Sequence, residues 1–352
     1  MRTDGRNLNR EQRILGIIET ARAKRPRFKD ERITMAHGAG GKATQTLIEG
    51  LLAPAFGIEE LADAALMDGI ALTTDSFVVK PLRFPGGSIG ELAVNGTVND
   101  LAVGGARPIA LSLALILEEG LDAEILRGEV EAIAAAAEAA GVRVVAGDTK
   151  VVERGHADGM YVCTTGVGLR DPRAELSPSA VRPGDRILVS GAIGEHGTAI
   201  MLARGDLGLA ADVQSDTRSL WPSVDAILGP GVRCLRDATR GGVASVLNEI
   251  ARAAGVAMLV READVPVAPA VAGAAELLGI DPMYVANEGK LVAFVAPDAA
   301  DAALARLRAH DDAAAAIGEV HAEPPGMVLV ETAFGGRRVM DQLVGDPLPR
   351  IC

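Results

Sequence analysis

The chain has 352 residues, of which 49% are hydrophobic and 23% charged, a composition that suits a globular protein of two domains. Its formal net charge of -12 disfavours nucleic acid as a partner, and no apolar run approaches the roughly 20 residues that span a bilayer. The three cysteines, Cys163, Cys234 and Cys352, are far apart, which argues against disulfides or a zinc site and favours the cytoplasm.

Residues 1–32 differ from the rest of the chain in charge. Ten Lys and Arg residues face five Asp and Glu residues there. The apolar run at 14–18 is too short for a signal-peptide core, and no small-residue cleavage site follows it. We interpret this segment as a basic N-terminal extension. It is either a partner-docking arm or an incidental extension, and the second interpretation is the simpler one.

From residue 33 onward, short runs rich in β-branched residues alternate with alanine-rich helical stretches, which is typical of mixed α/β domains. Strands are predicted over residues 71–74, 109–117, 142–146, 160–169, 186–190, 257–261, 291–295 and 327–331. Helices are predicted over residues 44–52, 89–102, 123–140, 197–204, 242–254 and 299–309. Turn residues fill 176–185, so two domains are expected to meet near residue 180.

The first glycine cluster is His37-Gly38-Ala39-Gly40-Gly41-Lys42. It precedes a predicted helix, so flexible backbone, a lysine and a helix N-terminus could together bind phosphate. It is not a Walker A sequence, because Ala43 follows Gly-Lys and the glycine spacing differs. An ordinary tight turn is the alternative.

Two acidic motifs follow in the same half of the chain. Asp75 ends a predicted strand, and Asp100 lies in a predicted helix behind Asn99. Carboxylates on neighbouring elements predict a Mg²⁺ site, because this cation prefers oxygen ligands. A capping role is the alternative for Asp75.

Three later motifs carry further charged groups. Residues 144–150 leave a predicted strand through Gly147 and end in Asp148, Thr149 and Lys150, a pattern suited to metal and phosphate. In the second half, residues 236–242 (Arg-Asp-Ala-Thr-Arg-Gly-Gly) precede a helix and residues 287–290 (Asn-Glu-Gly-Lys) precede a strand. Each motif is weak alone, and their joint order is much more specific.

The chain ends in Pro347-Leu348-Pro349-Arg350-Ile351-Cys352. Two prolines favour an extended backbone, and the segment from Gly345 could reach about 25 Å. A thiol at the end of such a segment could carry a covalent cargo between sites, with Arg350 nearby to lower the pKa of the thiol. A frayed terminus with an incidental cysteine is the alternative.

Taken together, the motifs resemble the HypE family of carbamoyl dehydratases in [NiFe]-hydrogenase maturation. The resemblance runs from about residue 33 to residue 352, and its most specific part is the terminal Pro-Arg-Ile-Cys. It implies an α+β, two-domain aminoimidazole ribonucleotide synthetase-like fold, shared with selenophosphate synthetase and thiamine monophosphate kinase. The implied parts are an ATP-binding domain at 33–175 that dimerises through its β-strands, an α/β sandwich at 176–340 and a flexible tail at 341–352.

The resemblance also implies a reaction. A carbamoyltransferase, HypF, loads a carbamoyl group on the terminal cysteine, and the protein dehydrates it to a thiocyanate with ATP. The cyanide ligand then passes to the HypC–HypD iron scaffold. The implied catalytic residues are Cys352, Lys150, Glu288 and His37, with either Glu288 or His37 as the base. The implied ATP-binding residues are Gly38, Gly40, Gly41, Lys42, Asp75, Asn99, Asp148, Thr149 and Arg240. The implied Mg²⁺ ligands are Asp75, Asp100, Asp148 and Asp237.

Other functions remain open at this point. A selenophosphate synthetase would need a reactive cysteine or selenocysteine near the first glycine cluster, where this chain has His37. A thiamine monophosphate kinase would have no use for the terminal cysteine. A non-enzymatic carrier that docks maturation partners would keep the tail without catalysis. We expect Cys163 and Cys234 to be buried structural residues.

Overall fold

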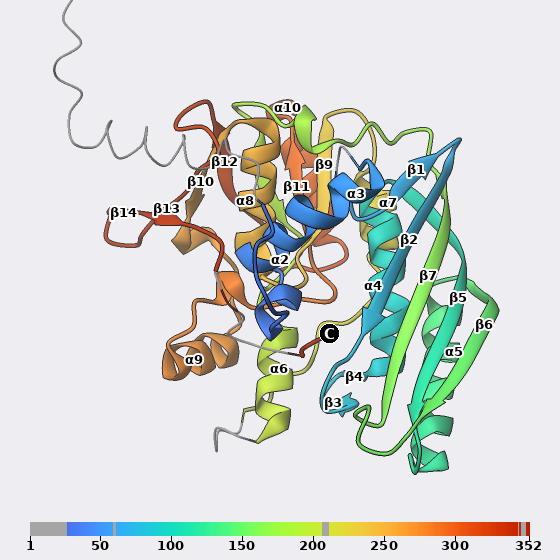
Figure 1. The fold of residues 1–352 in the computed structure, drawn as a ribbon. Helices are drawn as coiled ribbons and strands as arrows, with labels where there is room; N and C mark the ends of the chain where they lie inside the picture. Colours follow the sequence, from blue (N-terminus) through green and yellow to red (C-terminus); the bar gives the residue numbers. More distant parts are fainter. Residues whose placement is uncertain (1–26, 59–60, 206–210, 344, 346–349) are drawn as a thin grey trace, which may run out of the picture.

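The computed structural model of the chain describes residues 27–58, 61–205, 211–343, 345 and 350–352. Their secondary structure forms two large β-sheets, each with its own helices, and one two-stranded hairpin (Figure 1). Most of the predicted basic extension, and residues Pro347, Leu348 and Pro349 of the tail, lie outside these described residues. No helix in the described ranges is long and apolar enough to cross a membrane.

The first sheet has five strands in the order β1-β2-β7-β5-β6. All neighbours are antiparallel except β5 and β6, which are parallel. Its strands are β1 Ala65–Met67, β2 Ile70–Phe77, β5 Ala106–Glu118, β6 Arg143–Val152 and β7 Met160–Arg170. Before it come η1 Met35–Gly38, α2 Lys42–Leu47, the π-helical turn η2 Ile48–Leu52 and α3 Ala53–Phe56, and a small hairpin of β3 Arg83–Phe84 and β4 Gly87–Ser88 precedes α4.

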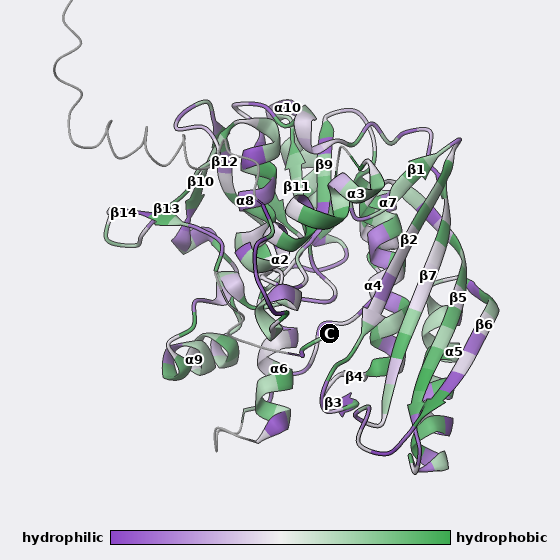
Figure 2. Cartoon of the chain, in the orientation of Figure 1, coloured by the Kyte–Doolittle hydropathy of each residue, from purple (hydrophilic) through white to green (hydrophobic). Residues whose placement is uncertain are grey.

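Helices α4 (Ile89–Val103) and α5 (Ala123–Ala139) cover one face of this sheet. Helix α4 is buried along nearly its whole length, because it also packs against the second half of the chain. The other face of the sheet carries exposed apolar side chains, and Figure 2 shows hydrophobic stretches on its strands. These exposed residues include Met67, Ile70, Leu72 and Leu169.

The second sheet has seven strands in the order β14-β13-β10-β12-β8-β11-β9. The β10–β13 pair is parallel and the other pairs are antiparallel. The strands are β8 Arg186–Val189, β9 Val232–Asp237, β10 Ala257–Arg261, β11 Leu291–Val295, β12 Ala315–His321, β13 Val328–Glu331 and β14 Arg337–Met340.

Both faces of the second sheet are covered, and strand β11 is accordingly apolar and buried along its whole length. In β8, Ile187 and Val189 join the core under α8 (Gly242–Ala254), whereas Leu188 joins the core under α7 (Trp221–Ile227) and α10 (Pro297–Arg308). The remaining helical elements of this half are η3 Pro178–Ala180, α6 Glu195–Arg204, η4 Glu262–Asp264, α9 Pro269–Leu278 and η5 Pro282–Tyr284.

The predicted strands and helices are all present, with shifted ends. For example, the strand predicted over 109–117 is β5, Ala106–Glu118. The prediction missed the strands β1, β3, β4, β9, β12 and β14 and the helices α3, α7 and α9. Strand β9 carries Arg236 and Asp237 at its end, and these charges interrupt the apolar alternation that indicates a strand.

Candidate active site

Three carboxylates converge from different elements. Asp63 precedes β1, Asp100 lies on α4 and Asp237 ends β9, and their ligand oxygens all lie within 4.8 Å of one another. Asp75, at the end of β2, adjoins the group through a side-chain hydrogen bond with Asp100. The prediction had named Asp75, Asp100 and Asp237 but not Asp63.

The close approach of these groups disfavours their charged forms. Burial raises the pKa of Asp100 well above its usual value, and the neighbouring charges of Asp237 and Asp75 raise it further. Burial and the charges of Asp63 and Asp75 raise the pKa of Asp237 in the same way. A set of half-buried to buried oxygen ligands that repel one another has the donor chemistry of a hard divalent cation site.

The thiol of Cys352 is inside the protein, against Arg240. The Arg240 Nη2 donates to the Cys352 Sγ at 2.6 Å, and its Nη1 donates to the Gly38 carbonyl. Burial raises the pKa of Cys352 to about 12, and Arg240 opposes this effect. The prediction that Arg350 lowers this pKa is wrong, because Arg350 is paired with Asp158 and the thiol pKa is raised.

Glu288 is the carboxylate closest in character to a catalytic base. It is 2% exposed, and among the described residues its Oε1 has no hydrogen-bond partner. Burial raises its pKa well above the usual value, Asp237 and Asp216 add to this, and Arg240 lowers it. The charge of Glu288 in turn raises the pKa of Cys352, so the thiol and this carboxylate share one site.

The backbone of Glu288 is held from two sides. Its N–H donates to Asp216 Oδ1 at 3.0 Å, and its carbonyl accepts from Asn99 Nδ2 at 3.2 Å. Asn99 also donates to the Arg218 carbonyl and accepts from the Leu220 N–H. Asn99 was predicted to bind ATP. In this structure its side chain instead makes hydrogen bonds that position Glu288 and the 218–220 segment.

The first glycine cluster packs against the same site. A Cβ on Gly40, whose φ is +73°, would lie 2.8 Å from the Arg240 carbonyl oxygen, so this turn requires glycine. Lys42 donates its N–H to the Leu343 carbonyl, and its Nζ pairs with Asp341 Oδ2 at 2.7 Å. The cluster thus connects Arg240 to the chain that leads into the tail.

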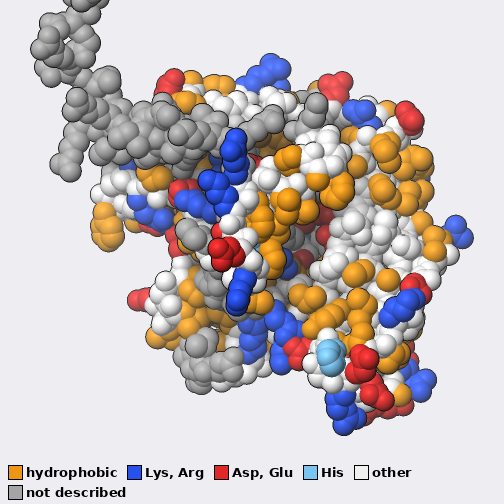
Figure 3. All heavy atoms as spheres, in the orientation of Figure 1, with side chains coloured by type: hydrophobic (Ala, Val, Ile, Leu, Met, Phe, Trp, Pro, Cys, Tyr) orange, Lys and Arg blue, Asp and Glu red, His pale blue; other side chains and the backbone are white. Residues whose placement is uncertain are grey.

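The last three residues fill a groove beside α6. Ile351 is 2% exposed and packs with Phe77, Val79 and Phe84. Figure 1 marks the C-terminus between α6 and β2, and Figure 3 shows that this face of the molecule is hollowed between the two halves of the chain. In this structure the thiol is directed inward, toward the carboxylates.

Four predicted residues lie elsewhere within a single chain. Asp148, Thr149 and Lys150 are exposed on β6, an edge strand, and Lys150 pairs with Asp148 at 2.5 Å. His37 is buried, but its ring accepts from the Thr34 N–H and pairs with Asp30 at 2.8 Å. The structure does not bring these groups to Cys352 in one subunit.

The two other cysteines differ from each other. Cys234 is 2% exposed and lies in the core under α8, as predicted. Cys163 is only partly buried, on the open face of the first sheet, where it lies 3.2 Å from Ser76 Oγ. The prediction of a buried Cys163 is wrong because its strand has only one covered face.

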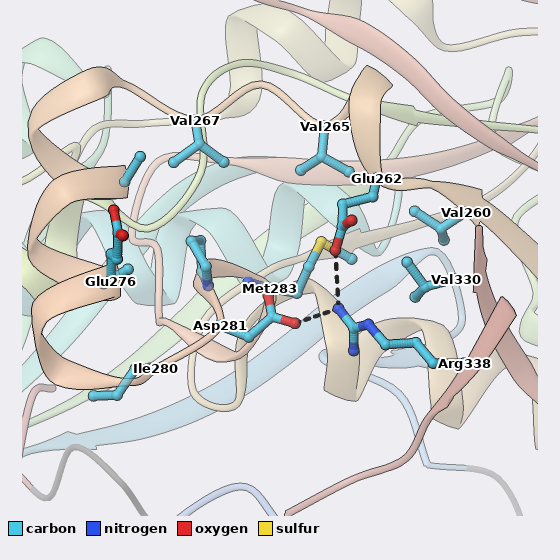
Figure 4. A pocket seen from close by; sticks show the side chains of 13 residues that line it. Val260, Glu262, Val265, Val267, Glu276, Ile280, Asp281, Met283, Val330 and Arg338 are labelled. Atoms are coloured by element: carbon cyan, nitrogen blue, oxygen red, sulfur yellow. Dashed lines mark hydrogen bonds and ion pairs between the residues drawn. The ribbon is translucent and has the colours of Figure 1, made fainter. Parts of the chain in front are cut away.

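A cavity of about 330 Å³ lies between α9, η5 and β10. Figure 4 shows apolar side chains such as Val265 and Met283 around it, with Arg338 joined to Glu262 and Asp281 at one wall. None of the residues predicted for the active site lines this cavity. The cavity is therefore separate from the site around Cys352.

The fold corresponds to a known class. Residues 61–170 match the N-terminal domain of AIR synthase related proteins, and residues 182–330 match their C-terminal domain. The two sheets and the site between them thus define an AIR synthase related protein, which confirms the predicted two-domain α+β fold.

Closer relatives narrow this class. The chain is 52% identical over 338 residues to the carbamoyl dehydratase HypE of Rhodobacter capsulatus, covering 92% of this chain and 99% of that relative. It is 45% identical over 335 residues to the HypE of Escherichia coli K12, covering 91% and 99%. The chain therefore belongs to the carbamoyl dehydratase HypE family.

Solved structures agree with this assignment. A structure of a HypE–HypF complex has a TM-score of 0.82 and 45% identity, covering 84% of this chain and 99% of that one. A structure of HypE in complex with ATP has a TM-score of 0.78 and 44% identity, covering 91% and 100%.

Proposed function

We propose that this protein uses ATP to dehydrate a carbamoyl group on its own Cys352 to a thiocyanate. The observation that carries the proposal is the inward Cys352 thiol, which Arg240 holds beside a Glu288 oxygen that has no partner among the described residues and close to Asp75. A tail that only carried cargo to a partner would not need a buried place of this chemistry.

The reaction follows from the poor leaving ability of the thiocarbamate oxygen. That oxygen attacks the γ-phosphorus of ATP, ADP departs, and the nitrogen loses one proton. The C–O bond then breaks to release phosphate while the nitrogen loses its second proton, which leaves S–C≡N on Cys352. The net change is loss of one water from the thiocarbamate, with ATP converted to ADP and phosphate. Positioning and charge stabilisation, rather than a protein nucleophile, drive such phosphoryl transfer.

Glu288 is the base that the geometry favours. Its carboxylate is buried beside Cys352 with one oxygen unpartnered among the described residues. Both ring nitrogens of the rival His37 are engaged with Thr34 and Asp30. A raised carboxyl pKa suits a group that must accept a proton and release it again.

The nucleotide would lie between the glycine cluster and the carboxylates. Gly38, Gly40, Gly41 and Lys42 offer backbone and positive charge for phosphate. Asp63, Asp75, Asp100 and Asp237 would hold Mg²⁺, which when bound offsets phosphate charge. The raised pKa values of the last three fit this role, because a cation relieves their mutual repulsion.

A homodimer would account for the residues that lie outside the single-chain site. The open face of the first sheet exposes the apolar residues named above and could pair with the same face of a second copy. The predicted residues Asp148, Thr149 and Lys150 would then act across the interface. A mixture of Cys352→Ala and Lys150→Ala proteins should regain activity if Lys150 acts on the tail of the other subunit, and should stay inactive otherwise.

The protein would work in the cytoplasm between two partners. HypF would load the carbamoyl group, as expected from the solved HypE–HypF complex of relatives. The HypC–HypD scaffold would accept the cyanide.

The test is the intact mass of the protein after incubation with HypF and carbamoyl phosphate, with and without ATP and Mg²⁺. An adduct on the Cys352 peptide that loses one water only with ATP would support the proposal. An adduct that never dehydrates would favour a carrier. Absence of any adduct would favour a small-molecule kinase or synthetase of the same class. Cys352→Ala is the control and should acquire no adduct.

A further inference from the structure

The tail is held in place by its backbone. Three consecutive carbonyls accept hydrogen bonds from the body of the protein: that of Arg350 from Arg204 Nη2 at 2.6 Å and Lys80 N at 3.2 Å, that of Ile351 from His196 Nε2 at 2.7 Å, and that of Cys352 from Val78 N at 3.2 Å. Two of these donors are side chains of α6.

We propose that His196 and Arg204 are positioning residues for the dehydration step, because they fix the register of the tail so that the Cys352 sulfur lies against Arg240 and Glu288. This inference deepens the proposed function and rests on it. Neither His196 nor Arg204 belongs to the sequence motifs from which the site was predicted. Both contact the backbone of the tail and not the Cys352 sulfur.

The His196 ring can donate in only one direction. A carbonyl accepts but cannot donate, so Nε2 carries the proton toward Ile351, and Nδ1 accepts from Ser215 Oγ at 2.8 Å. Ser215 Oγ itself accepts from the Thr217 N–H at 3.2 Å. The edge of the Phe84 ring lies against the imidazole. The ring is therefore oriented by groups that belong to the body of the protein, whether or not the tail is docked.

Removal of the tail would leave this donor without its acceptor. His196 is fully buried, and a buried donor without an acceptor destabilises the state that contains it. Arg204 connects the tail to the body in a second way, because its Nε donates to the Lys80 carbonyl at 2.9 Å while its Nη2 reaches Arg350. Both contacts favour the inward tail. A shift of the sulfur by about 1 Å is expected to slow the chemistry by roughly 100-fold.

The experiment compares His196→Leu and Arg204→Ala with the conservative variants His196→Gln and Arg204→Lys, all in a Cys163→Ala background. Three rates are measured: iodoacetamide modification of the Cys352 peptide, carbamoyl loading by HypF, and loss of water from protein carbamoylated beforehand. Arg306→Ala is the matched control. Arg306, on α10, also donates to a backbone carbonyl, but this is the carbonyl of Ala226 on α7 and not one of the tail.

We expect His196→Leu to accelerate alkylation about 10-fold or more and to slow dehydration roughly 10–100-fold, with loading at least as fast as before. Arg204→Ala should act in the same directions with a smaller effect, and both conservative variants should recover part of the loss. Arg306→Ala should change none of the rates.

Unchanged alkylation in both His196→Leu and Arg204→Ala would overturn the inference, as would slower dehydration without faster alkylation. If the His196→Leu protein melts at a much lower temperature, the rates of the Arg204→Ala protein test the inference instead. Arg204 is only partly buried, so its replacement should disturb the fold less. Failure of the parent protein to dehydrate its adduct would instead refute the proposed function, and the alkylation rates would still test the docking.

Discussion

The guanidinium of Arg240 contacts both the Cys352 sulfur and the Gly38 carbonyl. One side chain thereby joins the last residue of the chain to the glycine cluster near its beginning. Arg240 also lowers the pKa values of Cys352 and Glu288, against the larger effect of burial. The charge state of the site therefore depends on whether the tail is docked.

The docked thiol should be a poor nucleophile. Burial raises its pKa to about 12, compared with about 8.5 for a free cysteine. The neutral thiol is thus favoured inside, so docking is strongest below the free pKa and weakens as pH rises through 12. The rate of Cys352 alkylation should still be increasing above pH 9.5, and at pH 8 the docked thiol should react roughly 2,000-fold more slowly than a free peptide with the same ending. A plateau near pH 8.5 would contradict this prediction.

Glu288→Gln should separate loading from dehydration. The substitution keeps the size of the side chain but removes the proton acceptor, so we expect dehydration to fall about 100–1,000-fold. Carbamoyl loading and the melting temperature should change little. Single-turnover mass spectrometry of the carbamoylated protein measures the effect. His37→Gln, made in parallel, should dehydrate at a rate close to the parent, and a comparable loss there would reinstate His37 as the base.

Asp100→Asn should have opposite effects with and without metal. Its carboxyl pKa is raised well above the usual value by burial and by neighbouring carboxylates, so the neutral amide should raise the stability of the metal-free protein, by about 1 kcal/mol or more. The increase in melting temperature on adding Mg²⁺ should shrink, and metal-dependent turnover should weaken while loading continues. Melting curves in EDTA and in MgCl₂ test both effects.

Asp171→Asn is the matched control for the metal. Hydrogen bonds from Arg173 lower the pKa of Asp171 to about 2, so the neutral amide should slightly destabilise the protein. Its response to Mg²⁺ should equal that of the parent. A fully active Asp100→Asn variant with an unchanged Mg²⁺ response would remove Asp100 from the metal site.

Glu249 on α8 should make stability fall as the pH rises from 4.5 to about 7. Burial raises its pKa to about 7, so the stability it contributes is complete below its unfolded pKa near 4.5 and is lost as pH rises toward 7. Glu249 is exposed on α8, so solvent screening limits the size of this effect. Glu249→Gln should therefore stabilise the metal-free protein at pH 8 and have little effect near pH 5. Urea unfolding at the two pH values measures the difference.

Glu129→Gln is the contrasting variant, at a carboxylate with defined partners. The Glu129 carboxylate is fully buried, and it accepts from Arg83 Nε at 2.7 Å and from the Gly90 N–H at 3.1 Å. Removing its charge should destabilise the protein at pH 7 by about 1–3 kcal/mol. Equal responses of the two variants would contradict the expected stabilising role of the Glu129 partners.

Most of the longer helices and strands, and several residues of the candidate site, could be predicted from the sequence because both depend on local patterns. Alternation and helical spacing predicted β5 and α4, and acidic residues at the ends of elements pointed to Asp100 and Asp237. Strand β9 was missed because its charged end, which forms part of the site, interrupts that alternation.

The remaining residues act through contacts that are distant in the chain. Asp63 lies in a loop without a recognisable motif. It joins the site only because the fold brings it next to Asp100 on α4 and Asp237 on β9. His196 contacts Ile351, 155 residues away. Asp148 and Lys150 had a suggestive local pattern, but the pairing of β6 at the sheet edge places them on the surface. Single-sequence patterns do not encode such pairings.

The reacting sulfur is part of the chain itself, so the carbamoyl group is not a freely diffusing substrate. Each subunit presents one thiocarbamate to its site, at a local concentration set by the docked tail and not by the amount of any dissolved substrate. Saturation kinetics should therefore be visible for ATP but not for the carbamoyl group. After one cycle the site is blocked by its own product, and the speed of the protein depends on how quickly an acceptor empties the cysteine.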